Sequence, residues 1–137
     1  MKDCIFCKII KGEIPSAKVY EDEFVISFLD IAPNNKGHCL VVPKKHSNDF
    51  LEMDEKSIDS VFCAAKKIAN AIKNSLKCDF NIVMNNGKSA GQVVFHSHVH
   101  VVPRFEGDGF EYQKSKKEYK GSEIKEFAEK IKAHING

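Results

Sequence analysis

One long amphipathic helix constrains the fold of this 137-residue chain more than any other feature. From about Asp54 to Leu76, apolar side chains recur at spacings of three and four, which places them on one face of a helix. Asp54 is the predicted N-cap, because its carboxylate can accept a hydrogen bond from the first turn. The apolar stripe consists of Ile58, Val61, Phe62, Ala65, Ile68, Ala69, Ile72 and Leu76.

The segments around this helix have the patterns of β-strands. Two β runs, at 19–20 and 24–29, are separated by an acidic turn. The segment HCLVVP at 38–43 predicts a short strand that its proline ends. Residues 79–85 alternate as a strand does, and a further strand is predicted over about 93–102. Hairpin-length connections, rather than repeated βαβ units, favour an antiparallel α+β fold.

Shorter helices are predicted near both ends of the chain. Residues 4–12 fit a helical turn that stops near Gly12, and residues 122–135 fit an amphipathic helix with Ser122 as its cap. Neither an internal repeat nor a linker is evident, so residues 1–137 are predicted to form a single domain. The apolar stripe of the last helix consists of Ile124, Phe127, Ala128, Ile131 and Ile135.

The composition argues against nucleic-acid and membrane binding. Net charge is only +2, and the densest basic run, at 112–121, reads as a solvated loop. No apolar run approaches the roughly 20 residues of a membrane span, and the N-terminus does not resemble a signal peptide. We therefore expect a cytoplasmic protein. Its five cysteines are an odd number, which favours metal binding or burial over a disulfide framework.

Three of the six histidines stand at alternate positions in HSHVHVV. Alternate residues of a strand share a face, so His96, His98 and His100 are predicted to point to one side. Chance polarity, a metal site that uses all three, and simple burial are alternatives. On chemistry alone, catalysis by at least one of them is the favoured interpretation. The opposite face would carry Phe95, Ser97, Val99 and Val101.

Cys4 and Cys7 form a C-x-x-C pair near the N-terminus. Metal binding, a redox pair and incidental spacing are all open from the pattern itself. A thioredoxin-like redox pair requires a preceding strand in a βαβ context, and the sequence predicts neither. Metal binding is therefore the favoured interpretation.

These motifs together resemble the histidine triad (HIT) superfamily of nucleotide hydrolases and transferases. The resemblance covers nearly the whole chain and is carried by CIFCKIIKGEIPS, FLDIAPNNKGHCLVVPKKH and NNGKSAGQVVFHSHVHVVPR. The chain is most similar to the zinc-containing bacterial and protozoal branch, related to the histidine-triad nucleotide-binding proteins. The resemblance implies a five-stranded antiparallel sheet with one long and one C-terminal helix, and a homodimer formed through the long helix and an edge strand.

The resemblance also implies a nucleotide site. His98 would be the nucleophile that attacks the α-phosphorus, while His100 and Gln92 would contact the phosphoryl oxygens and the leaving group. The other implied nucleotide-binding residues are Asp30, on the ribose hydroxyls, and His38 and Asn85, near the phosphate. Phe6, Phe28 and Ile31 are candidates for an apolar base cleft.

Members of the family that carry the C-x-x-C pair bind zinc with two cysteines and two histidines. The matching residues here are Cys4, Cys7, His46 and His96. Two thiolates and two imidazoles give the closed tetrahedral coordination of a structural zinc, one per chain. His96 would then be a ligand, and it could not be the nucleophile.

The resemblance implies hydrolysis of purine nucleoside phosphoramidates or related AMP derivatives through a covalent nucleotidyl-histidine intermediate. Dinucleoside polyphosphate hydrolysis and a nucleotide-binding interaction module with vestigial catalysis are the alternatives. The chain departs from the family at Val93, where the eukaryotic members have a serine held to assist protonation of the leaving group. Valine cannot donate a proton. The C-terminal region also departs, because a charged helix replaces an aromatic, proline-rich tail.

Overall fold

The fold is centred on one antiparallel sheet. In the computed structural model, residues 3–111 and 115–135 are described. Within them five strands pair in the order β1-β2-β3-β5-β4, with every pair antiparallel. This confirms the predicted α+β class. The strands are β1 (Lys18–Glu21), β2 (Val25–Leu29), β3 (Cys39–Pro43), β4 (Asp79–Val83) and β5 (Val99–Arg104).

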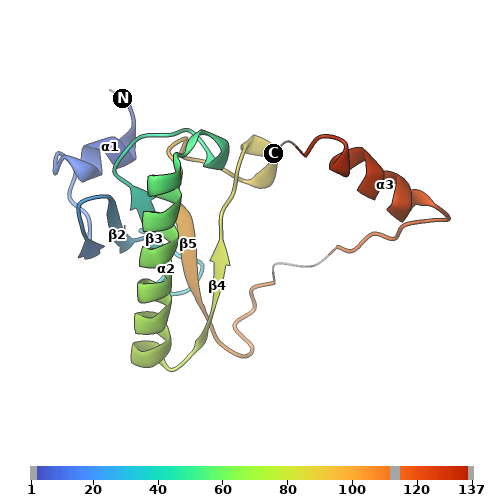
Figure 1. Ribbon diagram of the computed structural model, residues 1–137. Helices are drawn as coiled ribbons and strands as arrows, with labels where there is room; N and C mark the ends of the chain where they lie inside the picture. The colour runs from blue at the N-terminus through green and yellow to red at the C-terminus, as the bar shows by residue number, and fades with distance from the viewer. Residues whose placement is uncertain (1–2, 112–114, 136–137) are drawn as a thin grey trace.

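Helix α2 (Glu55–Leu76) crosses one face of the sheet (Figure 1). The predicted cap is confirmed, because the Asp54 carboxylate accepts the backbone N–H of Ser57 at 2.8 Å. The helix ends at Leu76 and is followed by the C-cap residue Lys77, whose φ of 54° is left-handed. Most of the predicted stripe packs in the main core against β2, β3 and β5, where Ala64 joins it. Two predicted members are exposed instead, Phe62 at 39% and Leu76 at 40%. The buried residues of α2 in this core are Val61, Ala64, Ala65, Ile68, Ala69 and Ile72.

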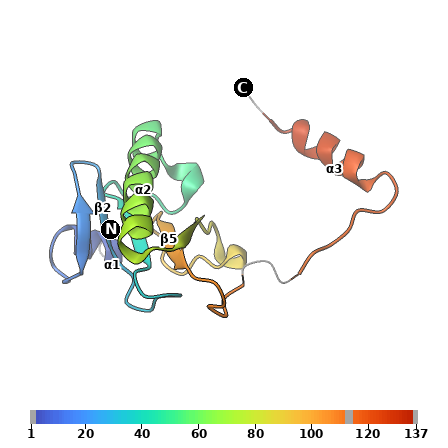
Figure 2. The ribbon, with the colours of Figure 1, turned by 90° about the horizontal axis from the view of Figure 1, so that it is seen from below.

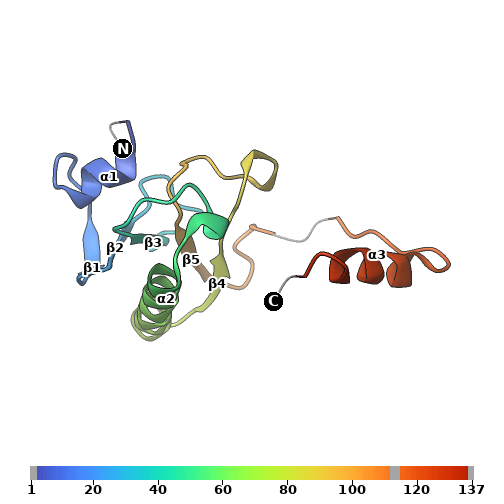
Figure 3. The ribbon, with the colours of Figure 1, turned by 45° about the horizontal axis from the view of Figure 1, so that its top comes forward.

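The other face of the sheet is covered in part by the short helix α1 (Ile5–Ile10), so that α1 and α2 lie on opposite sides of the sheet (Figure 3). Phe6 of α1 packs against Ile26, Phe28, Leu40 and Val42 in a second, smaller core. Along β5, side chains alternate between the two faces, and Val99 and Val101 point to α2. His100 therefore points to the α1 side.

Strand β5 is shorter than predicted, and this changes the histidine segment. It begins at Val99 rather than near residue 93, so His96 and His98 precede it. Pairing with β3 ends at Val41 opposite Val99, because β3 itself ends at Pro43, which has no N–H to donate. The connection from β4 is a long loop that contains a short 3-10 helix, η2 (Lys88–Ala90), and it is not of hairpin length.

A second short 3-10 helix, η1 (Phe50–Glu52), precedes α2. After β5 the chain leaves the sheet and ends in α3 (Glu123–Lys132), which stands apart from the other elements (Figures 1 and 2). The helix stops three residues before the predicted end. Ser122 does not form the predicted cap bond; its hydroxyl donates to the Glu126 carboxylate at 2.7 Å.

The basic run behaves as predicted where it is described: residues 115–121 are exposed, and residues 112–114 lie outside the described residues. No helix in the described part of the chain is both long and apolar enough to cross a membrane.

Candidate functional site

Two cysteines and two histidines converge beside the N-terminal helix. The side chains of Cys4, Cys7, His46 and His96 each offer one ligand atom, and these four atoms lie within 4.8 Å of one another. The Nδ1 atom of His96 lies 3.3 Å from the Cys4 sulfur and 3.5 Å from the Cys7 sulfur. The Nδ1 atom of His46 lies 3.4 Å from the Cys7 sulfur. The residues named for zinc in the sequence are thus brought together.

The outer nitrogens of both imidazoles are held by oxygen acceptors. Nε2 of His96 donates to the carbonyl oxygen of Pro43 at 2.8 Å, and Nε2 of His46 donates to Asn48 Oδ1 at 3.2 Å. Each neutral ring therefore turns an unprotonated Nδ1 inward, and the two Nδ1 atoms are 3.0 Å apart. Two lone pairs that face each other at this distance repel unless a cation lies between them. The donor set fits zinc, with the supporting carbonyl and amide typical of a metal-binding histidine.

His98 lies next to this cluster and opens onto a cavity. Its Nδ1–H donates to the carbonyl oxygen of His96 at 2.7 Å. This bond leaves the lone pair on Nε2. Burial lowers the pKa of His98, although the His96 carbonyl and the charge of Asp30 oppose the shift. The ring is thereby kept neutral and oriented.

His100 is oriented by a chain of hydrogen bonds that begins at the backbone. The N–H of Asn34 donates to Nδ1 of His38 at 3.1 Å, so neutral His38 carries its proton on Nε2. That proton is donated to Nδ1 of His100 at 2.9 Å. His100 must then carry its own proton on Nε2. Burial, followed by the charges of His98 and His38, lowers the pKa of His100 to about 4.

The two rings therefore have complementary roles at the same cavity: His98 offers a lone pair and His100 offers an N–H. Their ring centroids are 4.9 Å apart. Burial likewise lowers the pKa of His38. His38 does not line the cavity; it lies behind His100, where its Nε2 is 3.7 Å from Asp30 Oδ2.

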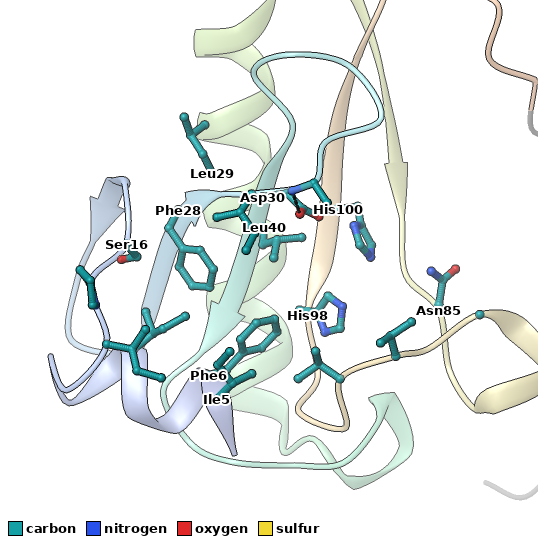
Figure 4. Close-up of a pocket in the computed structure, with 18 residues that line it drawn as sticks. Ile5, Phe6, Ser16, Phe28, Leu29, Asp30, Leu40, Asn85, His98 and His100 are labelled. Atoms are coloured by element: carbon teal, nitrogen blue, oxygen red, sulfur yellow. Dashed lines mark hydrogen bonds between the residues drawn. The ribbon is translucent and has the colours of Figure 1, made fainter. Parts of the chain in front are cut away.

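The cavity has a volume of about 430 Å³, which is within the range of small-molecule sites (Figure 4). Phe6 and Phe28 form part of its wall, with ring centroids 5.6 Å apart. Asp30 and Asn85 line it near the histidines, and Ile31 is fully exposed at its edge. An apolar half thus adjoins a polar half, as the nucleotide hypothesis requires.

Gln92 is placed differently from the other predicted residues. Its side chain is buried, with Oε1 accepting the N–H of Gly87 at 2.8 Å. Its Nε2 donates to the carbonyl oxygens of Asn48 and Val94 at 2.6 and 3.0 Å. Both ends of the amide thus brace the loop before β5, and Gln92 is not among the residues that line the cavity. The geometry suits a positioning residue.

Several supporting groups were missed at the sequence level. Ser97 donates its N–H to the Ser47 carbonyl at 2.8 Å, and the two hydroxyls are also 2.8 Å apart, which clamps the histidine segment to the loop that follows β3. Asn48 supports both His46 and Gln92. These bonds involve backbone atoms or common polar residues, so no motif indicates them. Phe95, predicted to pack beside Val99, is instead about half exposed.

Comparisons with known proteins agree with this geometry. The HIT domain family matches residues 11–107. A solved structure from Streptococcus mutans is 47% identical and has a TM-score of 0.93, covering 99% of this chain and 87% of that chain. A zinc-bound histidine triad family protein from Mycobacterium smegmatis is 39% identical with a TM-score of 0.77, over 83% of this chain and 84% of that chain.

Two curated relatives are named for enzymatic activities. The adenosine 5'-monophosphoramidase of Schizosaccharomyces pombe is 43% identical over 101 residues, which is 74% of each chain. The adenylylsulfatase of Arabidopsis thaliana is 43% identical over 107 residues, 77% of this chain and 54% of the relative. Sequence match and fold agree: this chain belongs to the HIT family.

Proposed function

We propose that the protein hydrolyses AMP derivatives at the α-phosphorus through a covalent intermediate on His98. The observation that carries the proposal is the pairing of tautomers at the cavity. His98 presents an unprotonated Nε2 because its Nδ1–H is bonded to the His96 carbonyl, and His100 presents a proton on Nε2 because His38 occupies its Nδ1. A nucleophile and a phosphate-binding donor are thus fixed side by side.

The reaction would take place in two displacements. In the first, the lone pair of His98 Nε2 forms a bond to phosphorus as the bond to the leaving group breaks. The leaving group departs with the electron pair of that bond; an amine takes up a proton from solvent, and an anionic group needs none. In the second, water attacks the phosphorus, the P–N bond to His98 breaks, and AMP is released with the proton lost to solvent. His100 would donate its N–H to a phosphoryl oxygen, where negative charge must be stabilised in both steps.

The remaining residues would bind the nucleoside and its phosphate. Asp30 would accept hydrogen bonds from the ribose hydroxyls, and Asn85 would donate to the phosphate. Phe6 and Phe28 would enclose a purine base in the apolar half of the cavity, where stacking and edge contacts favour an aromatic ligand. His38 and Gln92 would act indirectly, through His100 and through the loop.

Val93 bears on the choice of leaving group. Its side chain is 86% exposed and lines the cavity, yet it can neither donate nor accept a hydrogen bond. An amine must be protonated to leave, whereas sulfate and phosphate leave as stable anions. AMP derivatives with an anionic leaving group should therefore depend less on a donor at this position.

We further propose that Cys4, Cys7, His46 and His96 bind one structural zinc, and that the chain forms a homodimer through α2 and the edge strand β4. The converging ligand atoms support the zinc. Exposed apolar residues on β4, Phe80 and Ile82, support the pairing. Zinc would not take part in the chemistry; it would hold the segment that orients His98.

A substrate panel tests the proposed function. Adenosine 5'-phosphoramidate, adenylyl sulfate and diadenosine tetraphosphate are incubated with the enzyme, and AMP release is followed by chromatography. We expect turnover of the first two, with AMP as the nucleotide product. Turnover of the dinucleotide alone would favour a polyphosphate hydrolase. Tight AMP binding without turnover of any compound would indicate that the protein is a nucleotide-binding module, which would contradict the proposal.

The dependence of activity on pH provides a second test. The nucleophile acts as a neutral imidazole, and burial lowers the pKa of His98 below its ordinary 6.5. Activity is therefore retained at neutral pH and lost as pH falls through the lowered pKa. We expect kcat/KM to fall on the acid side with an apparent pKa below 6.5. The zinc content of the lowest-pH sample is measured alongside, and a midpoint above 6.5 with zinc retained would contradict the assignment.

A further inference from the structure

Helix α3 exposes an apolar stripe that nothing in its own chain covers within the described residues. Ile124, Phe127 and Ile131 are 61%, 47% and 63% exposed, and none of the residues of α3 is buried. Its ring contact is local, between Phe127 and Tyr119 at 5.9 Å. A ten-residue helix is marginal in water by itself, and helices in proteins gain most of their stability by packing an apolar face. The stripe therefore requires a partner.

The position of α3 excludes its own sheet as that partner. The arm that follows β5 carries α3 past the β4 edge and away from the sheet, as two views show (Figures 1 and 3). The Streptococcus mutans structure matches 99% of the chain with a TM-score of 0.93, so the matched part includes α3. The projecting arm is thus shared with a solved structure.

A second exposed apolar surface lies on the same side of the molecule. We call it the α2–β4 groove, a hollow of about 600 Å³ between the helix and the edge strand. Its apolar lining includes Phe62, Phe80 and Ile82, which are 39%, 36% and 44% exposed. Polar side chains also line it, namely Lys66, Lys67, Asn70 and Lys73. A strand edge flanked by apolar side chains is a typical pairing site. The arm projects past this edge.

We propose that each α3 packs its stripe on the body of a second copy of this chain, so that two chains exchange arms. This rests on the homodimer proposed above, in which the α2–β4 grooves face each other across a two-fold axis. A body placed against the β4 edge lies on the side toward which the arm extends. Two-fold symmetry makes each contact twice, so both apolar surfaces are covered in a closed dimer and neither is left to bind further copies.

Cross-linking of mixed chains tests the exchange directly. Light and heavy-isotope chains are mixed, equilibrated and treated with a lysine-reactive cross-linker, and peptides are identified by mass spectrometry. We expect cross-links from Lys125 or Lys132 of α3 to lysines of residues 8–88 to include light–heavy pairs. Cross-links of α3 to the body found only within one chain would overturn the exchange and place α3 on its own domain.

Sedimentation equilibrium supplies the energetic test. The stripe variant Ile124→Ser/Phe127→Ser/Ile131→Ser should raise the dimer dissociation constant at least about tenfold, because three apolar side chains lose their burial. The control Glu126→Ser/Glu129→Ser/Lys130→Ser changes three polar positions of the same helix and should leave the constant within about twofold. An unchanged constant for the stripe variant would overturn the exchange.

A third variant separates this inference from the pairing on which it rests. Ile82→Lys places a charge in the α2–β4 groove and should also weaken the dimer. If the unmodified protein is monomeric, the proposed pairing fails. If it is dimeric and sensitive to Ile82→Lys but not to the stripe variant, the pairing stands and only the arm exchange fails. Neither outcome bears on AMP release, which the substrate panel measures in parallel.

Discussion

Replacing His98 with alanine should reduce AMP release by about 10⁴-fold or more, the scale on which removal of a covalent nucleophile acts. The change removes the Nε2 lone pair that attacks phosphorus. The zinc ligands, the wall formed by Phe6 and Phe28, and the donor on His100 are left in place. We therefore expect His98→Ala to bind AMP with an affinity close to that of the unmodified protein.

Two measurements make this result specific. Rapid acid-free quenching of the unmodified enzyme, followed by mass spectrometry, should reveal a nucleotidyl adduct on the peptide that contains His98. The matched control is His134→Ala, because His134 is an exposed histidine that does not line the cavity, and its Nδ1 donates to the carbonyl oxygen of Lys130 at 3.0 Å. Full activity of His98→Ala would show that another group is the nucleophile.

Replacing Cys4 and Cys7 together with serine should remove the zinc and lower the melting temperature by ~10 °C or more, since a structural zinc contributes directly to folding. Metal analysis of protein purified without chelator should find about one zinc per chain. Cys63→Ser is the matched control, because Cys63 is an exposed, free cysteine on α2. If the unmodified protein contains no zinc, the site is wrong.

The same double variant should lose activity even at temperatures where it remains folded. His96 joins the two sites: its ring faces the cysteines, and its carbonyl oxygen holds Nδ1 of His98. Without zinc, the His96 segment loses an anchor, and a misplaced His98 lowers kcat more than it raises KM for the nucleotide. A rise in KM with kcat unchanged would assign the zinc to substrate binding instead.

Patterns of hydrophobicity were sufficient to predict most of the fold. The stripe of α2, its Asp54 cap and four of the five strands appear close to their predicted positions, because each depends on local periodicity. The predicted start of β5 was wrong for a non-local reason. Where β5 begins depends on the end of its partner strand β3 at Pro43, and on the hydrogen bond between Ser47 and Ser97.

The sequence indicated most of the residues that converge beside the cavity, but not their geometry, and His38 and Gln92 lie outside its lining. The residues named for zinc and His98, His100, Asp30 and Asn85 lie where a shared site requires. Alternation along a strand suggested three equivalent histidines, yet His96 turns toward the cysteines. The tautomers depend on backbone groups of Pro43 and Asn34, and a backbone carbonyl or N–H has no signature in a sequence.

The cavity beside His98 has a consequence for how it would hold an anion. Its lining residues, as far as the chain is described, include neither lysine nor arginine. With the histidines neutral, the carboxylate of Asp30 is the only formal charge among these lining side chains. A phosphate there would be held by hydrogen bonds from neutral donors, with little Coulombic attraction. Such a site gives binding that depends weakly on salt, and it releases a doubly charged product more readily than a cationic site would.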